Sequence, residues 1–250
     1  MTHYALLGGG RLAQHLRHYL SLLNLPCSGW TRDGNPLLNS HAHSHPGERL
    51  RATVLPASHV LLLVSDSAIG EVLRRYPFLH EKTLLHCSGT LSFPGVAGAH
   101  PLMTFGHRLY DLEHYRHIPF MVDGGHVFAD LLPGLPNPHF SIRTEDKPRY
   151  HALCVMAGNF SQLLWQAAAG RFADMGLPAD TLYAYLQQSL DNFIQDPATA
   201  LTGPLSRGDQ TTIERNIQSL AGDPLQPVYR AFVKLHGTSQ QHSALQEVAS

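Results

Sequence analysis

The decisive stretch of this sequence is Tyr4-Ala5-Leu6-Leu7-Gly8-Gly9-Gly10-Arg11-Leu12-Ala13. Its order predicts a buried strand, then a glycine turn of the form G-x-G-x-x-A, and then an amphipathic helix. The first glycine permits a tight turn, the second lets the backbone approach phosphate groups, and the small last residue lets helix and strand pack closely. The N–H groups at the start of the helix are then available to an anion. We therefore expect the pyrophosphate of a dinucleotide to lie on Gly8, Gly10, Arg11 and Leu12.

The length and composition exclude several classes of protein. The 250 residues suffice for one large domain or two modest ones, and 18 basic against 19 acidic residues leave a net charge of −1. A balanced charge gives no support to binding of nucleic acid or of an anionic membrane. The sequence shows no signal peptide and no apolar run near the ~20 residues of a membrane helix. Isolated cysteines at 27, 87 and 154 suit a reducing compartment, so we expect a cytoplasmic enzyme.

Histidine is unusually frequent, with 18 residues, and three of them alternate at His41, His43 and His45. Such a cluster has the side chains to bind a metal ion. The turn-forming residues around it favour a solvated loop instead. Because alternating histidines with no distant partner rarely close a metal site, we predict no metal.

A second strand is predicted from Leu25 to Trp30, followed by Thr31 and Arg32. In proteins that bind NAD, the end of this strand usually carries an acidic residue that binds the ribose 2′-OH. A hydroxyl followed by a guanidinium suits a 2′-phosphate better, because arginine forms charge-assisted bonds with it. The pair therefore favours NADPH over NADH. The alternative is that Arg32 is an ordinary surface charge.

The clearest strand is the apolar run from His59 to Val64, which is typical of a parallel strand buried on both faces. It ends in Ser65-Asp66-Ser67, which can cap a helix beginning near Ala68. Another strand at Thr83–Leu85 ends in His86-Cys87-Ser88-Gly89. Ligands of open α/β sheets lie beyond the carboxyl ends of the strands, so we expect a cofactor cleft there. Its candidate residues are Ser65, Asp66, His86 and Ser88, although the first two can serve only as caps and His86 can be a core residue.

The composition changes between residues 143 and 148. Short strands at Ile118–Val122 and His139–Arg143 complete the predicted sheet. From Pro148 onward the apolar residues have helical spacing, and no strand is predicted. We therefore expect a nucleotide domain at 1–143 and an all-helical domain at 144–250.

The second domain opens with Lys147-Pro148, where proline suits the start of a helix. Lys147 then lies at the positive end of the helix dipole, which should lower its pKa and suit it to proton transfer. At ~100° per residue, Lys147 and His151 differ by about 40° and His151 and Asn159 by about 80°. All three side chains can then face one cleft. The alternative is that Lys147 is a solvated lysine beside a helix start.

The segment Leu201-Thr202-Gly203-Pro204-Leu205-Ser206-Arg207-Gly208-Asp209 precedes another predicted helix, for which Asp209 is the N-cap. A loop of this composition before a helix can bind a substrate carboxylate through Thr202, Gly203 and Arg207. It can equally be a tight structural connection.

These segments together resemble a family of bacterial proteins that pair a Rossmann-like NADP-binding domain with a helical C-terminal domain of unknown function. The resemblance covers nearly the whole chain. It rests on the glycine turn, Val64-Ser65-Asp66, His86-Cys87-Ser88-Gly89, Lys147 with His151, Asn159, and above all the specific strings His100-Pro101-Leu102-Met103-Thr104-Phe105 and Leu201-Thr202-Gly203-Pro204 with Arg207-Gly208-Asp209.

The family is related to ketopantoate reductases, pyrroline-5-carboxylate reductases and β-hydroxyacid dehydrogenases. The resemblance implies a doubly wound parallel sheet, a helical domain of the 6-phosphogluconate dehydrogenase C-terminal type, a homodimer, and a substrate cleft between the domains. Some members resemble an alternative ketopantoate reductase of pantothenate synthesis. The sequence departs from the related enzymes at one position. They place asparagine about one turn after the lysine, where this chain has His151, so the proton donor stays open among Lys147, His151 and Asn159.

The resulting hypothesis is an NADPH-dependent reductase of a small 2-oxo acid, with ketopantoate as the leading substrate. Lys147 would protonate or polarise the carbonyl oxygen, and His151 or Asn159 would orient it. The expected substrate-binding residues are His100, Thr202, Gly203 and Arg207. Two alternatives remain open, namely an imine reductase of the pyrroline-5-carboxylate type and a non-catalytic NADP-binding sensor.

Overall fold

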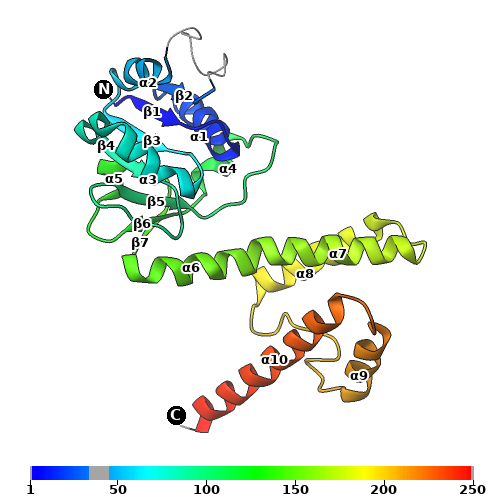
Figure 1. Ribbon diagram of the computed structural model, residues 1–250. Helices are drawn as coiled ribbons and strands as arrows, with labels where there is room; N and C mark the ends of the chain where they lie inside the picture. Colours follow the sequence, from blue (N-terminus) through cyan, green and yellow to red (C-terminus); the bar gives the residue numbers. More distant parts are fainter. Residues whose placement is uncertain (1, 34–44, 249–250) are drawn as a thin grey trace. The chain divides into compact units, whose positions relative to one another are not determined.

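The computed structural model describes residues 2–33 and 45–248 of the chain (Figure 1). The chain divides into two compact units, Met1–Leu164 and Trp165–Ser250. The first unit contains the sheet and the first helix beyond it. The second consists of helices alone within the residues that the structure describes. The last strand ends at Ile142, after which the described chain is helical or irregular, as the change in composition predicts.

The first unit is built on a seven-stranded sheet with the order β2-β1-β3-β4-β5-β6-β7. The first five strands in the chain are mutually parallel, β6 is antiparallel to β5, and β7 is parallel to β6. The predicted α/β fold with a dominant parallel sheet is thus confirmed, and its last two strands run opposite to the other five. An apolar run shows that a strand is buried but not in which direction it runs. The strands are β1 (Tyr4–Leu7), β2 (Cys27–Trp30), β3 (His59–Leu62), β4 (Thr83–His86), β5 (Ala97–Pro101), β6 (Phe120–Asp123) and β7 (His139–Ile142).

Helices cover both faces of this sheet (Figure 1). One face packs against α1 (Arg11–Leu22), α4 (Leu112–Arg116) and α5 (Phe128–Leu131). The other packs against α2 (Pro46–Val54), α3 (Asp66–Arg75) and the 3-10 turn η1 (Pro77–Glu81). Two apolar clusters on opposite faces of one sheet confirm the doubly wound arrangement.

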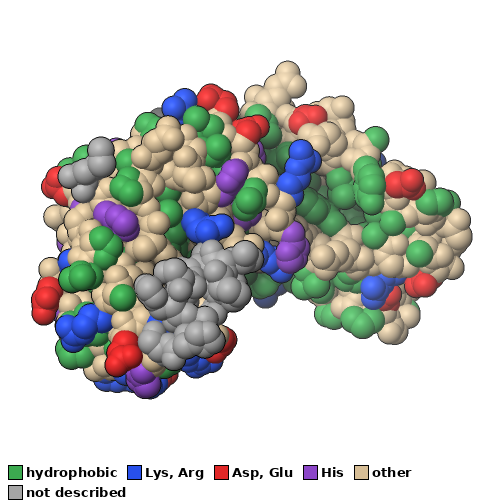
Figure 2. Space-filling view, turned by 90° about the horizontal axis from the view of Figure 1, so that it is seen from above, with side chains coloured by type: hydrophobic (Ala, Val, Ile, Leu, Met, Phe, Trp, Pro, Cys, Tyr) green, Lys and Arg blue, Asp and Glu red, His purple; other side chains and the backbone are tan. Residues whose placement is uncertain are grey.

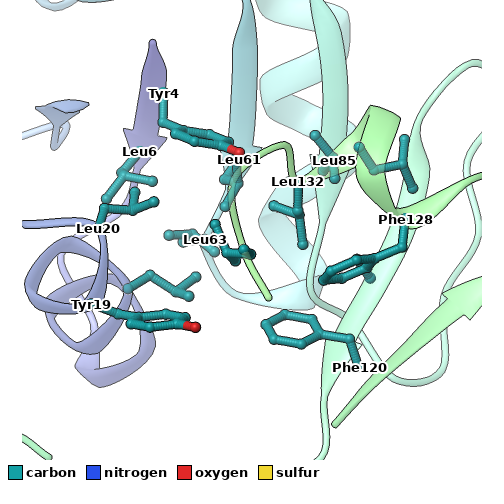
Figure 3. Close-up of a cluster of buried hydrophobic side chains, with 14 of the residues drawn as sticks. Tyr4, Leu6, Tyr19, Leu20, Leu61, Leu63, Leu85, Phe120, Phe128 and Leu132 are labelled. Atoms are coloured by element: carbon teal, nitrogen blue, oxygen red, sulfur yellow. The ribbon is translucent and has the colours of Figure 1, made fainter. Parts of the chain in front are cut away.

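The larger cluster joins α1 to the centre of the sheet. Figure 3 shows Tyr19 and Leu20 of α1 among side chains that project from the strands, and all of the labelled residues are buried. Because α1 packs against β1 and β3, the turn after β1 is held at the edge where the parallel strands end. Strands β2 and β3 flank β1 on opposite sides, so this turn lies at the point where the order of strands reverses. Ligands of open α/β sheets bind at this point.

A continuous helical stretch follows the sheet. It comprises the 3-10 turn η2 (Thr144–Asp146), α6 (Lys147–Cys154), the π-helical segment η3 (Val155–Phe160) and α7 (Ser161–Asp174). The remaining elements are η4 (Ala179–Leu182), α8 (Tyr183–Gln195), α9 (Gln210–Ser219) and α10 (Leu225–Val248). Asp209 is the N-cap of α9, as predicted, since its Oδ1 accepts a bond of 3.1 Å from the Thr212 backbone N–H. None of the helices in the described ranges combines the length and the apolar character that crossing a bilayer requires.

The helical unit has a small core. In its described part, the buried apolar side chains are Leu182 and Ile213. A two-pronged ion pair ties α7 to the turn before α10, because the Arg171 guanidinium donates bonds of 2.9 and 2.8 Å to Asp223. Large apolar side chains of α7, α8 and α10 are exposed instead, and Figure 2 shows apolar side chains on the surface of the molecule.

Candidate active site

The turn after β1 requires glycine at its first position. Gly8 has a φ of +144°, and a Cβ placed on it would lie 2.3 Å from the carbonyl oxygen of Leu63 in the neighbouring chain segment. The Gly8 N–H donates a bond of 2.9 Å to the Trp30 carbonyl, which fixes the turn to the end of β2. A side chain at residue 8 therefore fits neither the backbone angle nor the space. The predicted role of the first glycine is confirmed.

The start of α1 is open to an anion. Gly10 is the N-cap, no side chain of residues 2–33 or 45–248 accepts from the first N–H groups of the helix, and its first turn holds no acidic residue. A Cβ on Gly10 would meet nothing within 4 Å, so glycine here serves something other than packing. Arg11 is exposed and Leu12 is half-buried in this first turn. Unpaired N–H groups, the positive end of a helix dipole and a guanidinium make a donor set that fits a pyrophosphate.

The residues after β2 lie beside this turn. The methyl group of Thr31 would be 3.0 Å from a Cβ on Gly9, so Thr31 borders the glycine turn. The Arg32 side chain is exposed, and its guanidinium lies 3.6 Å from the Asp33 carboxylate. Sequence reasoning missed Arg49, a buried residue of α2 that donates a bond of 2.9 Å to the Arg32 carbonyl. The backbone that carries Arg32 is thereby braced, while the guanidinium can reach a ligand.

Ser88 joins the ends of β3 and β4. Its hydroxyl donates a bond of 2.6 Å to the Asp66 carboxylate and accepts bonds from the N–H groups of Thr90 and Leu91. The alternative role of Ser65 and Asp66, as caps of a helix that begins near Ala68, is seen only in the position of Ser65. Helix α3 begins at Asp66 itself, with Ser65 as an N-cap residue whose side chain makes no capping bond. The Asp66 carboxylate binds Ser88 instead, because the two strand ends lie side by side in the sheet.

His86 belongs to the core. It is 0% exposed, its Nδ1 accepts a bond of 3.2 Å from the Ser88 N–H, and its Nε2 has no hydrogen-bond partner among the described residues. Burial, followed by the nearby Lys147 charge, lowers the pKa of His86 to about 4. The ring is therefore neutral near pH 7 and lies beneath the carboxyl edge rather than on its surface.

The buried histidines make the stability of the protein sensitive to acid. The unfolded chain protonates His86 near its ordinary pKa of 6.5, whereas the folded chain does so only near 4. The free energy of unfolding should therefore fall by about 3 kcal/mol from this residue as the pH falls from 6.5 to 4. His100, whose pKa is also lowered to about 4, acts in the same direction. Urea unfolding at several pH values should show a shallower fall for His86→Asn, which keeps an acceptor for the Ser88 N–H. Equal slopes would contradict the assignment.

His100 and His151 meet above the end of β4. Their ring centroids are 5.8 Å apart, and His100 Nδ1 lies 2.8 Å from the Tyr150 hydroxyl. A Cβ on Gly89 would lie 2.5 Å from the His151 ring and 3.1 Å from the His100 ring, so glycine admits both. Burial lowers the pKa of His100, with smaller contributions from His151 and Lys147. Burial also raises the pKa of the Tyr150 hydroxyl. The second turn of α6 and the end of β5 thus bring together two predicted site residues.

Lys147 forms a buried ion pair. It is 2% exposed, and its Nζ donates a bond of 2.7 Å to Oδ1 of Asp123 at the end of β6. The alternative of a solvated lysine is therefore wrong. Lys147 is the first residue of α6, whereas the sequence predicts that the helix begins one position later, at Pro148. Sequence reasoning missed Asp123, although an acidic residue at a strand end before two glycines was the available signal.

Asn159 is not brought to this group. It lies in the π-helical segment η3 with an exposed side chain, which makes no hydrogen bond to a described residue. The predicted angle to His151 assumed α-helical geometry throughout. A π-helix forms i→i+5 bonds and so places more residues in each turn, which changes the direction of every side chain after residue 155.

The predicted carboxylate loop lies in the helical unit. Gly203 has a φ of +89°, and its carbonyl accepts bonds from the Arg207 N–H at 3.3 Å and the Ser206 hydroxyl at 3.1 Å. Thr202 and the Arg207 side chain are exposed. These contacts close the loop on itself, as a structural connection does, and leave its polar side chains available. Its role in substrate binding stays a prediction.

In the described ranges, no group of three or more His, Cys, Asp or Glu residues could hold a metal ion. His41 and His43 lie outside the described residues. His45 is the N-cap of α2, since its Nδ1 accepts a bond of 3.2 Å from the Gly47 N–H.

Comparisons with known proteins agree with this architecture. Residues 121–235 match a family model described as a domain of unknown function, DUF2520. Among solved structures, a protein of Bacteroides fragilis provisionally assigned as an NADP oxidoreductase is 21% identical, with a TM-score of 0.73 over 94% of this chain and 97% of that one. A search of curated proteins finds no match.

Two further structures share the fold at greater distance. A reductive aminase from Aspergillus terreus, in complex with NADPH and ethyl levulinate, is 14% identical, with a TM-score of 0.63 over 97% of this chain and 94% of that one. The pyrroline carboxylate reductase of Plasmodium falciparum, with NADP bound, is 13% identical, with a TM-score of 0.57 over 95% of this chain and all of that one (100%). At these identities the likenesses establish a common Rossmann-like fold with a helical C-terminal part.

Proposed function

We propose that this protein is an NADPH-dependent reductase that transfers hydride to a C=O or C=N bond of a small substrate. The observation that carries the proposal is the glycine turn of Gly8 and Gly10, which leads into the uncapped start of α1 at the reversal point of the sheet. His100, near the end of β5, and His151 lie together beside Gly89, which follows β4 in the same unit. A phosphate site and titratable groups thus share one edge of the sheet.

The donor set specifies how the cofactor would be held. The N–H groups of the first turn of α1 and the Arg11 guanidinium would bind the pyrophosphate, and Thr31 and Arg32 would bind the 2′-phosphate. Ser65 and Asp66, both exposed at the end of β3, would border the nicotinamide. When bound, NADPH supplies the hydride. The hydroxyl of Ser88 donates to Asp66 and orients that carboxylate, while the role of Ser88 beside the nicotinamide stays a prediction.

The remaining residues would handle the proton and the charge of the substrate. His151 is half-exposed beside Gly89 and can donate a proton to the oxygen or nitrogen of the reduced bond. Lys147 is covered but keeps a positive charge near that atom, which stabilises negative charge as it develops. The binding of a substrate carboxylate by Thr202, Gly203 and Arg207 stays a prediction from the sequence.

Two substrate classes fit this arrangement. A 2-oxo acid, with ketopantoate as the leading candidate, follows from the sequence resemblance. A cyclic imine is favoured by the common fold with a reductive aminase and a pyrroline carboxylate reductase. NADPH oxidation with a panel of 2-oxo acids and cyclic imines distinguishes the two classes. Tight NADPH binding without turnover of any panel member would instead favour a sensor and contradict the reductase.

Arg32→Ala should weaken NADPH far more than NADH. Loss of a charge-assisted hydrogen bond of about 1.5–3 kcal/mol predicts about a 10- to 100-fold rise in the Kd for NADPH and little change for NADH. Titration calorimetry with both nucleotides gives the two values. Arg116→Ala, an exposed arginine of α4, is the matched control. Equal losses for both nucleotides would contradict the assignment of the 2′-phosphate.

The protein should be a homodimer joined through the helical unit. That unit exposes Phe193 (57%) and Ile194 (70%) of α8 and Trp165 (43%) of α7, while its described part buries two apolar side chains. Exposed apolar side chains of this kind mark an interface with another protein. The resemblance implies that this partner is a second copy of the chain. Light scattering should give twice the mass of the 27.6 kDa chain, and a monomer for Phe193→Glu with Ile194→Glu. Leu55→Glu, at an equally exposed position (76%) of the sheet unit, is the control. A monomeric parent protein would contradict the dimer.

A further inference from the structure

The ion pair of Asp123 and Lys147 occupies a small recess over β5. Asp123 ends β6 and Lys147 begins α6, and the two are 24 positions apart in the sequence. Strand β5 runs beside β6, and in the continued register Gly98 lies next to Asp123. The Gly98 N–H donates a bond of 2.9 Å to Asp123 Oδ2, while Oδ1 accepts from Lys147. Both carboxylate oxygens are therefore bound, and the side chain cannot turn away.

Glycine at residue 98 makes room for this pair. A Cβ there would lie 2.5 and 2.6 Å from the two oxygens of Asp123 and 2.6 Å from Lys147 Nζ. The other neighbour of Gly98 in the sheet is His86 of β4. A strand interior that lacks a side chain is unfavourable for packing. The recess therefore serves to place the two charges between β4 and β6.

Stability alone does not account for a buried pair of charges. An ammonium and a carboxylate out of water are costly to desolvate, and apolar residues of similar volume often stabilise a fold as well or better. Lys147 Nζ also carries three donors, of which one binds Asp123 within the described part of the chain. The ion pair therefore keeps the Lys147 ammonium, which has further N–H donors, beneath the edge that carries His100 and His151.

We propose that Asp123 is a positioning residue for the reduction, acting through Lys147, and that Gly98 is the position that admits the pair. Asp123 fixes the ammonium beneath the reacting edge, where its positive charge would stabilise the negative charge that develops on the oxygen or nitrogen of the substrate. This inference rests on the proposed function, since it gives Lys147 a place in the reduction. It adds Asp123 and Gly98 to the residues proposed for the reduction. Both belong to the sheet rather than to the glycine turn or the helical unit.

The first test is kinetic. Asp123→Asn keeps the size of the side chain and removes its charge, so kcat should fall on the order of 100-fold while the Kd for NADPH changes little. Gly98→Ala should give the same loss by displacing the pair. Asp146→Asn is the matched control. Asp146 directly precedes α6 and, like Asp123, forms an ion pair with a bond of 2.7 Å, but its partner is Arg143 and its side chain is 43% exposed. A kcat for Asp123→Asn equal to that of the parent protein would overturn the proposal.

A double variant separates positioning from simple support of the fold. Asp123→Asn with Lys147→Met replaces the pair by two neutral side chains of similar size. If Asp123 positions Lys147 for the reaction, the thermal unfolding temperature recovers relative to Lys147→Met alone but kcat does not. Recovery of kcat together with stability would show that the pair only supports the fold, and would overturn the proposal.

The second test needs no turnover. The buried Lys147 amine should be protected from an amine-reactive acylating reagent, with the modified sites read by mass spectrometry. Asp123→Asn removes a bond to a charged group, so the rate of Lys147 acylation should rise about 10-fold or more, while exposed Lys234 is unchanged. Unchanged protection would overturn the role of Asp123. If the parent protein reduces no substrate, the proposed function fails, and the acylation rates still decide whether Asp123 holds Lys147.

Discussion

Gly8→Ala is expected to destabilise the sheet unit and to abolish binding of NADPH. The new Cβ would lie 2.3 Å from the Leu63 carbonyl oxygen, on a residue whose φ of +144° disfavours any side chain. Moving the turn away from β3 should cost about 2–5 kcal/mol of unfolding free energy. It would also displace the first N–H groups of α1, and the loss of two such bonds to phosphate predicts at least a 100-fold rise in Kd. Urea unfolding and nucleotide titration measure the two effects.

Gly10→Ala is the matched comparison. A Cβ at residue 10 meets no atom of the protein within 4 Å, so the stability should fall by about 1 kcal/mol or less. The same Cβ would occupy the space that a pyrophosphate needs, so binding of NADPH should still be lost. A stable Gly10→Ala protein that binds NADPH like the parent would contradict the placement of the phosphates at this turn.

Lys147→Ala is expected to have the largest effect on turnover. Removal of the ammonium leaves the Asp123 carboxylate buried without its cation, which should cost about 3–5 kcal/mol of stability. The positive charge near the reacting atom is also lost, so kcat should fall by about 100-fold or more. The Kd for NADPH should hardly change, because the glycine turn makes no contact with Lys147.

The design of that experiment separates folding from chemistry. Lys147→Met keeps the length of the side chain, and activity per folded protein is compared after measurement of the folded fraction. Lys234→Ala, at an exposed position of α10, controls for the loss of a lysine as such. Near-normal kcat in the folded Lys147 variants would remove this residue from the mechanism.

The sequence predicts the nucleotide-binding half well because its signals are local. The apolar run at β3 and the glycine turn before α1 each lie within about ten residues, where periodicity and turn chemistry act directly. Strand β5 was missed because Ala97-Gly98-Ala99 has neither an apolar run nor β-branched residues. Its glycine is explained only by the ion pair packed over it.

The reacting edge was predicted in part. Lys147, His151 and His100 were identified, but the link from Lys147 to Asp123 joins residues 24 positions apart and depends on the reversed direction of β6. No local pattern encodes that pairing. Asn159 was placed by assuming one continuous α-helix, whereas the π-helical segment at Val155–Phe160 alters the phase of the helix.

The most direct test of the account is transfer of deuterium from NADPH labelled at C4 of the nicotinamide. Each substrate of the panel that is turned over should gain one deuterium at the carbon of the reduced bond, as mass spectrometry of the product would show. Gly10→Ala should give no labelled product above background, and Lys147→Met should form it more slowly by about 100-fold or more. NADPH that binds tightly and transfers no deuterium to any 2-oxo acid or cyclic imine would contradict a reductase and leave a nucleotide-binding protein.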